Sequence, residues 1–228
     1  MSIRYIYAHM LVIFKGEIMT EEKKMDNYLM RCWLESIQGI VGSNGLKSIL
    51  NYAHLQKYID NFPPDDGKIE VPCADAQLLF FSLYELFGQK GVRNLSLRTG
   101  REFARIGLKG RKNVAKAMKA ASHLLPEAKR IHLVLKICAA ETNKSLSHQK
   151  GEEICSVKEE EDYFLLIYKD HFESDGIVST SPVCGVVEGI INYAVEWATG
   201  HAHEVEEIEC RAMGHPADVL RIWKRRKE

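Results

Sequence analysis

The hydrophobic periodicity of this chain changes near residue 143, and this change limits the folds that the chain can adopt. Before it, apolar residues recur every three or four positions, as in helices, over residues 26–41, 46–55, 72–88, 96–108 and 113–142. After it, β-forming or alternating residues dominate segments 152–157, 163–168, 204–212 and 219–223. This order predicts an α+β fold with N-terminal helices packed on an antiparallel sheet, a helix over 183–199 and a C-terminal β-hairpin.

Length and composition fit one globular domain. The 228 residues are 46% hydrophobic and 27% charged, which allows a sizeable core. We expect residues 25–228 to form a single domain. We interpret residues 1–24 as an extension that is disordered or precedes the true start, because Met19 and Met25 are alternative start positions. A short strand over the apolar run 5–14 is the alternative interpretation.

The charge and cysteine patterns exclude several partners. Acidic and basic residues number 31 each, so no global field favours nucleic acid or an anionic membrane. The apolar run 5–14 is too short to span a bilayer, and no longer one follows. The 6 cysteines are too sparse for a disulfide scaffold. We therefore expect a cytoplasmic protein that binds neither nucleic acid nor membrane.

Common catalytic motifs are missing from the sequence. Gly39, Gly42 and Gly45 join two helices and do not follow a strand, so they do not form a dinucleotide-binding loop. His201 and His203 follow a helix that ends at Gly200, and we interpret them as partners of its C-terminus. No catalytic residue is predicted, and whether the chain is an enzyme stays open.

One tract carries residues suited to bind a metal, namely Cys184, Glu207, Cys210 and Asp218. Thiolates and carboxylates are both ligands of zinc. A hairpin loop with an odd number of residues centred on Gly214 would place Cys210 opposite Asp218, whereas an even loop would separate them. Glu207 lies three residues before Cys210 and so on the other face of an ideal strand. A bulge at positions 208–209, or the length of the Glu207 side chain, would be needed to bring its carboxylate to the other residues. The alternative is two buried cysteines and a solvated row of carboxylates.

The same tract resembles a known family. Cys184-Gly-Val-Val-Glu-Gly189, with the segment from Val205 to Ile222, is similar to the C-terminal signature of the 4-vinyl reductase (hydrocarbon-binding) domain family. Residues 84–88, with Gly100 and Gly107, resemble its weaker N-terminal features. That family is related to the ligand-binding fold of nitric-oxide-signalling and Golgi-transport proteins.

The resemblance implies a structural Zn²⁺. Its metal-binding members use Cys, Glu, Cys and Cys, which carries over to Cys184, Glu207 and Cys210 in this sequence. The fourth position is Asp218 where the family has Cys, and His215 is a neighbouring substitute. With four protein ligands the metal would have no open position for catalysis.

The resemblance also implies a function. It predicts a stand-alone sensor or binding domain for a small hydrophobic molecule (aromatic, hydrocarbon or tetrapyrrole-like), which forms a homodimer through its N-terminal helices. Two alternatives stay open. One is a reductase or accessory protein of tetrapyrrole metabolism of the bacteriochlorophyll type, and the other is a scaffolding subunit without a ligand.

Overall fold

The computed structural model describes residues 23–110, 125–145 and 153–227. Its helices are α2 (Asn27–Tyr52), α3 (Cys73–Gly110), α5 (Glu127–Ser145) and α6 (Gly185–Thr199), with 3₁₀ turns η1 (Gln56–Tyr58) and η2 (Arg211–Met213). Its strands are β1 (Lys24–Asp26), β2 (Ile69–Pro72), β3 (Cys155–Glu159), β4 (Tyr163–Tyr168), β5 (His203–Glu209) and β6 (Asp218–Arg226). The predicted α+β class, the 183–199 helix and the C-terminal hairpin are confirmed.

Some predictions lie outside the described residues. These are the extension 1–24, apart from its last two residues, and the start of the predicted 113–142 helix. Lys24 already belongs to β1, which pairs with β2 in a small antiparallel sheet. Among the described helices, none is both long and apolar enough to cross a membrane.

Glycines divide the two N-terminal helices, as the sequence predicted. Gly42 adopts φ 76° inside α2, and Gly88 adopts φ 65° inside α3. Positive φ is readily available to glycine and strained for most other residues, so each helix changes direction at that point. The sequence predicted separate helices, whereas the structure joins them across sharp kinks. Asp26 caps the N-terminus of α2, because its side chain accepts a hydrogen bond from the Leu29 amide at 2.6 Å.

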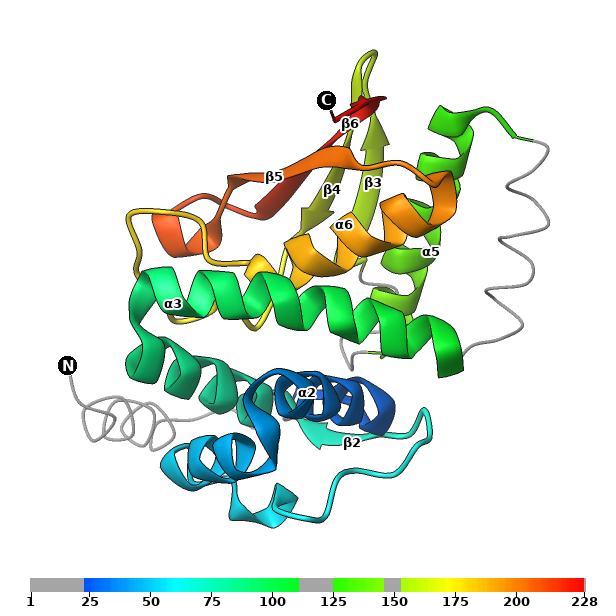
Figure 1. Cartoon of the computed structure of the whole chain (residues 1–228). Coiled ribbons are helices and arrows are strands. Elements are labelled where there is room, and N and C mark those ends of the chain that lie inside the picture. The colour runs from blue at the N-terminus through cyan, green and yellow to red at the C-terminus, as the bar shows by residue number, and fades with distance from the viewer. Residues whose placement is uncertain (1–22, 111–124, 146–152, 228) are drawn as a thin grey trace.

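The second sheet is antiparallel, in the order β3-β4-β6-β5. Along β4, Phe164, Leu166 and Tyr168 are buried, while the residues between them are only partly buried. The buried face packs against α5 and α6 through Ile131, Leu135, Ile191 and Val195, among other residues. Figure 1 shows α6 between α3 and the sheet, so the N-terminal helices reach the sheet through α6.

Helices α3 and α6 approach each other through glycine. A Cβ atom at Gly100 would lie 2.0 Å from the Val186 carbonyl oxygen, and one at Gly189 would lie 2.2 Å from the Leu97 carbonyl oxygen. Both carbonyl oxygens belong to the backbone and cannot move away as a flexible side chain could. The absence of side chains at these two positions therefore sets the distance between α3 and α6, whose first residue follows Cys184 directly.

Candidate metal centre

The C-terminal hairpin has the register that the metal-site hypothesis requires. Glu209 pairs with Val219, a pair centred on Gly214, so Cys210 and Asp218 stand at the two ends of the loop. The register shifts between Glu207 and Glu209, which confirms the bulge that Glu207 needed. The loop between β5 and β6 contains the 3₁₀ turn η2. Gly214 ends that turn with φ 92°.

The structure brings all four predicted residues together. Cys184, Glu207, Cys210 and Asp218 each offer one donor atom, and these atoms lie within 4.8 Å of one another. All four residues are buried, Cys210 completely. Cys184 directly precedes α6, and its backbone amide donates a hydrogen bond to Glu207 Oε2 at 2.9 Å. A cluster defined by these four residues thus joins α6 to the hairpin.

The cluster has dimensions that suit zinc after a small contraction. Zinc lies about 2.3 Å from thiolate sulfur and about 2.1 Å from carboxylate oxygen in tetrahedral sites, so ligand atoms there stand roughly 3.4–3.8 Å apart. The donor atoms would have to close in from a limit of 4.8 Å. Glu207 Oε1 is buried and has no hydrogen-bond partner in the described part of the chain. An oxygen in that position is free to bind a cation.

Neighbouring groups orient the fourth member of the cluster. The Ser174 hydroxyl donates to Asp218 Oδ2 at 2.6 Å, and the Arg211 amide donates to Oδ1 at 2.7 Å. Each oxygen keeps lone pairs that these bonds do not use. His215, the alternative ligand, is exposed in the loop and lies outside the cluster. Of the two, the geometry favours Asp218.

A further buried carboxylate, Glu173, was missed by sequence reasoning. It is fully buried, and its two oxygens accept hydrogen bonds from the amides of Val186 and Val187 at 2.8 and 3.0 Å. These amides belong to the first turn of α6, where a carboxylate is favourable. Glu173 is distant from this turn in sequence, and neither it nor Ser174 belongs to a recognisable motif.

Burial makes the cluster reluctant to hold negative charge. It raises the pKa of Glu207, although the thiols of Cys210 and Cys184 act in the opposite direction. It raises the pKa of Cys184 well above its usual range, and contact with Cys210 and the nearby carboxylates of Glu173, Glu207 and Asp218 add to the effect. The pKa of Glu173 is also raised well above its usual range, first by burial. A bound cation would reverse this preference.

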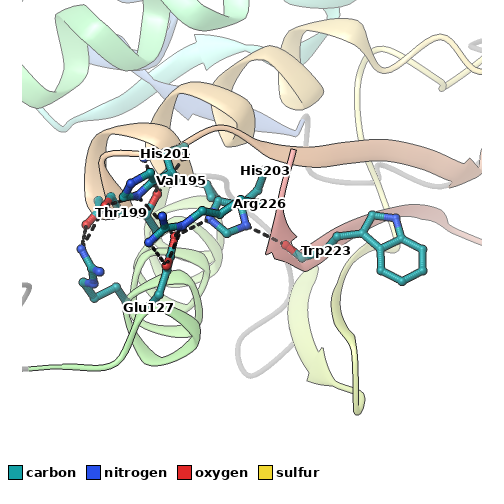
Figure 2. Close-up of polar contacts among 9 residues, drawn as sticks. Glu127, Val195, Thr199, His201, His203, Trp223 and Arg226 are labelled. Atoms are coloured by element: carbon teal, nitrogen blue, oxygen red, sulfur yellow. Dashed lines mark hydrogen bonds and ion pairs between the residues drawn. The ribbon is translucent and has the colours of Figure 1, made fainter. Parts of the chain in front are cut away.

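The predicted histidine roles hold for one of two residues. The His201 ring lies 3.1 Å from the Thr199 carbonyl oxygen at the end of α6, as expected of a C-terminal helix partner. His203 instead belongs to β5, and its side chain is fully buried. It contacts the Trp223 carbonyl and the Glu127 carboxylate (Figure 2), which no sequence motif indicated.

One open pocket of about 420 Å³ lies beside α2. Its walls mix charged, polar and apolar side chains, including Arg31, Lys47, Tyr58, Asp60 and Phe62. Lys47 and Asp60, which both line the pocket, form an ion pair at 2.7 Å. The pocket shares no residue with the metal cluster, and its polar lining is unlike that of a hydrocarbon site.

Comparisons of sequence find no relative. No family model matches the chain, and no curated protein matches it. The resemblance to the 4-vinyl reductase domain family therefore stays a prediction.

Comparisons of structure find a fold shared with H-NOX proteins. The Fe(II) unliganded H-NOX protein from K. algicida superposes with a TM-score of 0.59 at 13% identity, covering 90% of this chain and 97% of that one. The H-NOX protein from S. oneidensis in the Fe(II)NO state has a TM-score of 0.52 at 11% identity, covering 87% and 99%. An oxygen-binding H-NOX domain related to soluble guanylate cyclases has a TM-score of 0.52 at 14% identity, covering 89% and 96%. At such low identity the likeness establishes the fold: this chain has an H-NOX-like architecture.

Proposed function

We propose that this chain is a small-molecule-binding domain of the sensor type, whose α6 and C-terminal hairpin are held together by a structural Zn²⁺. The ion would be bound by Cys184, Glu207, Cys210 and Asp218. The observation that carries the metal proposal is the buried convergence of four donor atoms within 4.8 Å. A set of two sulfurs and two oxygens suits zinc.

Electrostatics support the same conclusion. Glu173, Glu207 and Asp218 are three buried carboxylates grouped with two buried thiols. The nearby Arg211 directs its guanidinium towards Asp170 and Asp175 and offers only its amide to Asp218. Buried charges require a compensating partner. A divalent cation would supply this compensation and would stabilise the folded state by its binding free energy.

The small-molecule part of the proposal is supported by the shared fold. H-NOX structures include an oxygen complex and a nitric-oxide ligation state. We propose a small hydrophobic ligand for this chain, either aromatic, hydrocarbon or tetrapyrrole-like. His203 gives no support for a haem ligand, because its side chain is fully buried and both of its ring nitrogens already contact protein oxygens.

The metal proposal is tested by measuring zinc in the full chain purified without added metal. We expect about one zinc per chain, lost in Cys210→Ser. Cys155→Ala is the matched control, because Cys155 is a fully buried free cysteine outside the cluster. Retention of zinc by Cys210→Ser, or absence of zinc from the wild-type protein with unchanged stability in chelator, would contradict the proposal.

The ligand proposal is tested separately, by native mass spectrometry and by thermal shift with phenol, toluene and a tetrapyrrole. A binding domain shows a concentration-dependent rise in melting temperature. A reductase would instead turn over substrate with an added nicotinamide or flavin, and a scaffold would show neither response. The same native spectrum reports whether the chain is a homodimer.

A further inference from the structure

The pocket of about 420 Å³ lies where α2 bends at Gly42. Its lining residues come from the half of α2 before Gly42, from the half after it, and from residues 58–62. Figure 1 shows the two halves of α2 set at an angle to each other. The Gln38 side chain donates a hydrogen bond to the Ser43 hydroxyl at 2.8 Å across the bend. Because of the bend, both halves of the helix take part in one pocket.

The lining has a buried apolar part and an exposed charged part. Leu46 and Leu50 are buried, and Phe62 is half-buried. The Lys47 side chain is 43% exposed, and that of Asp60 is 73% exposed. A volume of this size suits a small molecule, and such a lining suits one that has an apolar body and a charged end.

Lys47 already binds a carboxylate in the pocket, that of Asp60. Nζ of Lys47 lies 2.7 Å from Oδ2 of Asp60. An ion pair that is this exposed contributes little stability, because water solvates both charges and salt screens their attraction. Asp60 also adopts φ 53°, which is uncommon for residues other than glycine but tolerated by Asp and Asn. Asp60 therefore marks a position for an anion without holding it tightly.

Arg31 brings further donors to the lining from the first half of α2. Its Nε lies 2.9 Å from Glu35 Oε1, and its Nη1 donates to the Pro63 carbonyl at 2.9 Å. These contacts fix the orientation of the guanidinium and compensate its charge. A guanidinium has five N–H donors, and the two contacts use two of them. Lys47 is thus the cation that an incoming anion takes from Asp60, with Arg31 as a source of hydrogen bonds.

We propose that this pocket binds a small organic carboxylate whose charged end replaces Asp60 at Lys47. The apolar body of the ligand lies on Leu46, Leu50 and Phe62. A ligand carboxylate makes the same charge-assisted contact with Lys47 that Asp60 makes, and its body adds apolar contact that Asp60 lacks. The site is separate from the proposed zinc, because the pocket and the metal cluster have no residue in common. Neutral molecules such as phenol and toluene carry no charge with which to displace Asp60.

Binding is tested by titrating the ¹⁵N-labelled full chain with sodium benzoate at pH 7 and following the amide signals. Benzamide is the neutral control, because it has nearly the same shape and carries no charge. We expect benzoate to shift the amides of residues 43–47 and 58–62, and to bind at least about fivefold more tightly than benzamide. Equal binding of the two compounds, shifts confined to other parts of the chain, or no shift at about 10 mM benzoate would overturn the proposal.

Substitutions at the two ends of the ion pair should change benzoate affinity in opposite directions. Asp60→Asn removes the competing carboxylate and keeps a residue that tolerates positive φ, so benzoate should bind about two- to fivefold more tightly. Lys47→Met removes the anchoring charge and should weaken binding at least about tenfold, whereas Lys47→Arg should retain it. Lys68→Met is the matched control, because Lys68 pairs with Asp66 at 3.8 Å and lies outside the pocket.

The variants also separate a specific site from general attraction to positive charge. If Lys68→Met weakens benzoate binding as much as Lys47→Met does, the attraction is general and the pocket is not the site. Unchanged or weaker binding by Asp60→Asn would show that Asp60 does not occupy the position of a ligand, and would refute the proposal. The amide spectrum of each variant reports whether it is folded. If Lys47→Met does not fold, Asp60→Asn and the benzamide control decide the outcome by themselves.

Discussion

Gly100→Ala should destabilise this protein, although alanine is the better helix former. The new Cβ would lie 2.0 Å from the Val186 carbonyl oxygen and 2.9 Å from the Ile190 nitrogen, both backbone atoms of α6. A carbon atom normally lies at least about 3.3 Å from a carbonyl oxygen, so α3 and α6 would have to separate locally by roughly 1 Å. Overpacking of this kind costs about 1–3 kcal/mol.

The magnitude follows from two opposing effects. With backbone on the other side of the contact, we take the upper value, about 3 kcal/mol. Replacing glycine by alanine inside a helix returns about 1 kcal/mol. The net loss is about 2 kcal/mol in the free energy of unfolding, which for a domain of this size lowers the melting temperature by roughly 4–8 °C.

The assay compares urea unfolding of Gly100→Ala with that of Gly107→Ala. Gly107 belongs to the same helix, and a Cβ there would meet nothing within 4 Å. Gly107→Ala should therefore leave stability unchanged or raise it by up to about 1 kcal/mol. If the two variants have midpoints within the equivalent of about 0.5 kcal/mol, the close approach of α3 and α6 does not control stability, and the reasoning is refuted.

Three further predictions concern other polar side chains. Asn143→Ala should lower the free energy of unfolding by about 2–3 kcal/mol. The reason is that the Asn143 side chain donates to the Cys155 carbonyl at 2.8 Å and accepts from the Ile154 and Cys155 amides at 2.9 Å. Asn143→Asp keeps the acceptor oxygen, so its free energy of unfolding should fall by less in the same urea assay. In chelator, the free energy of unfolding should fall as pH rises above about 4.3, because burial raises the pKa of Glu173 and the folded state then binds more protons than the unfolded chain. With zinc bound, the free energy of unfolding should instead rise with pH. Urea unfolding from pH 4.5 to 8 checks this, and the same pH dependence with and without zinc would contradict it. Asp218→Cys should keep one zinc per chain by elemental analysis, since thiolate replaces carboxylate at the same end of the loop, whereas Asp218→Ala should weaken zinc retention in chelator.

Much of this fold follows from local pattern. The strand predicted at 163–168 matches β4 in full, and Gly42 and Gly88 interrupt helices where predicted. A high content of β-forming residues and the placement of glycines are local properties, so sequence alone reveals them. The sequence did not predict that the two helices on either side of each glycine form one kinked helix. That outcome depends on what each half of the helix packs against.

The four residues of the candidate site were named from the sequence, whereas their surroundings were not. The hairpin register and the bulge before Glu209 were stated as conditions on spacing, and the structure meets both. The sequence did not predict that Glu173 and Ser174 lie beside the site, because they belong to an irregular segment whose path depends on α6 and the sheet. His203 was assigned to the helix end since two residues separate it from Gly200, yet the chain had already entered β5.

The spacing of the four cluster residues along the chain has a consequence for folding order. Glu207, Cys210 and Asp218 belong to one hairpin, whereas Cys184 lies before α6. Contacts between residues close in sequence form with little loss of chain entropy, and distant ones form later. A metal taken up early would therefore meet three ligands in the hairpin and acquire the fourth only when α6 docks. Its capture by Cys184 would then mark the arrival of α6 between α3 and the sheet.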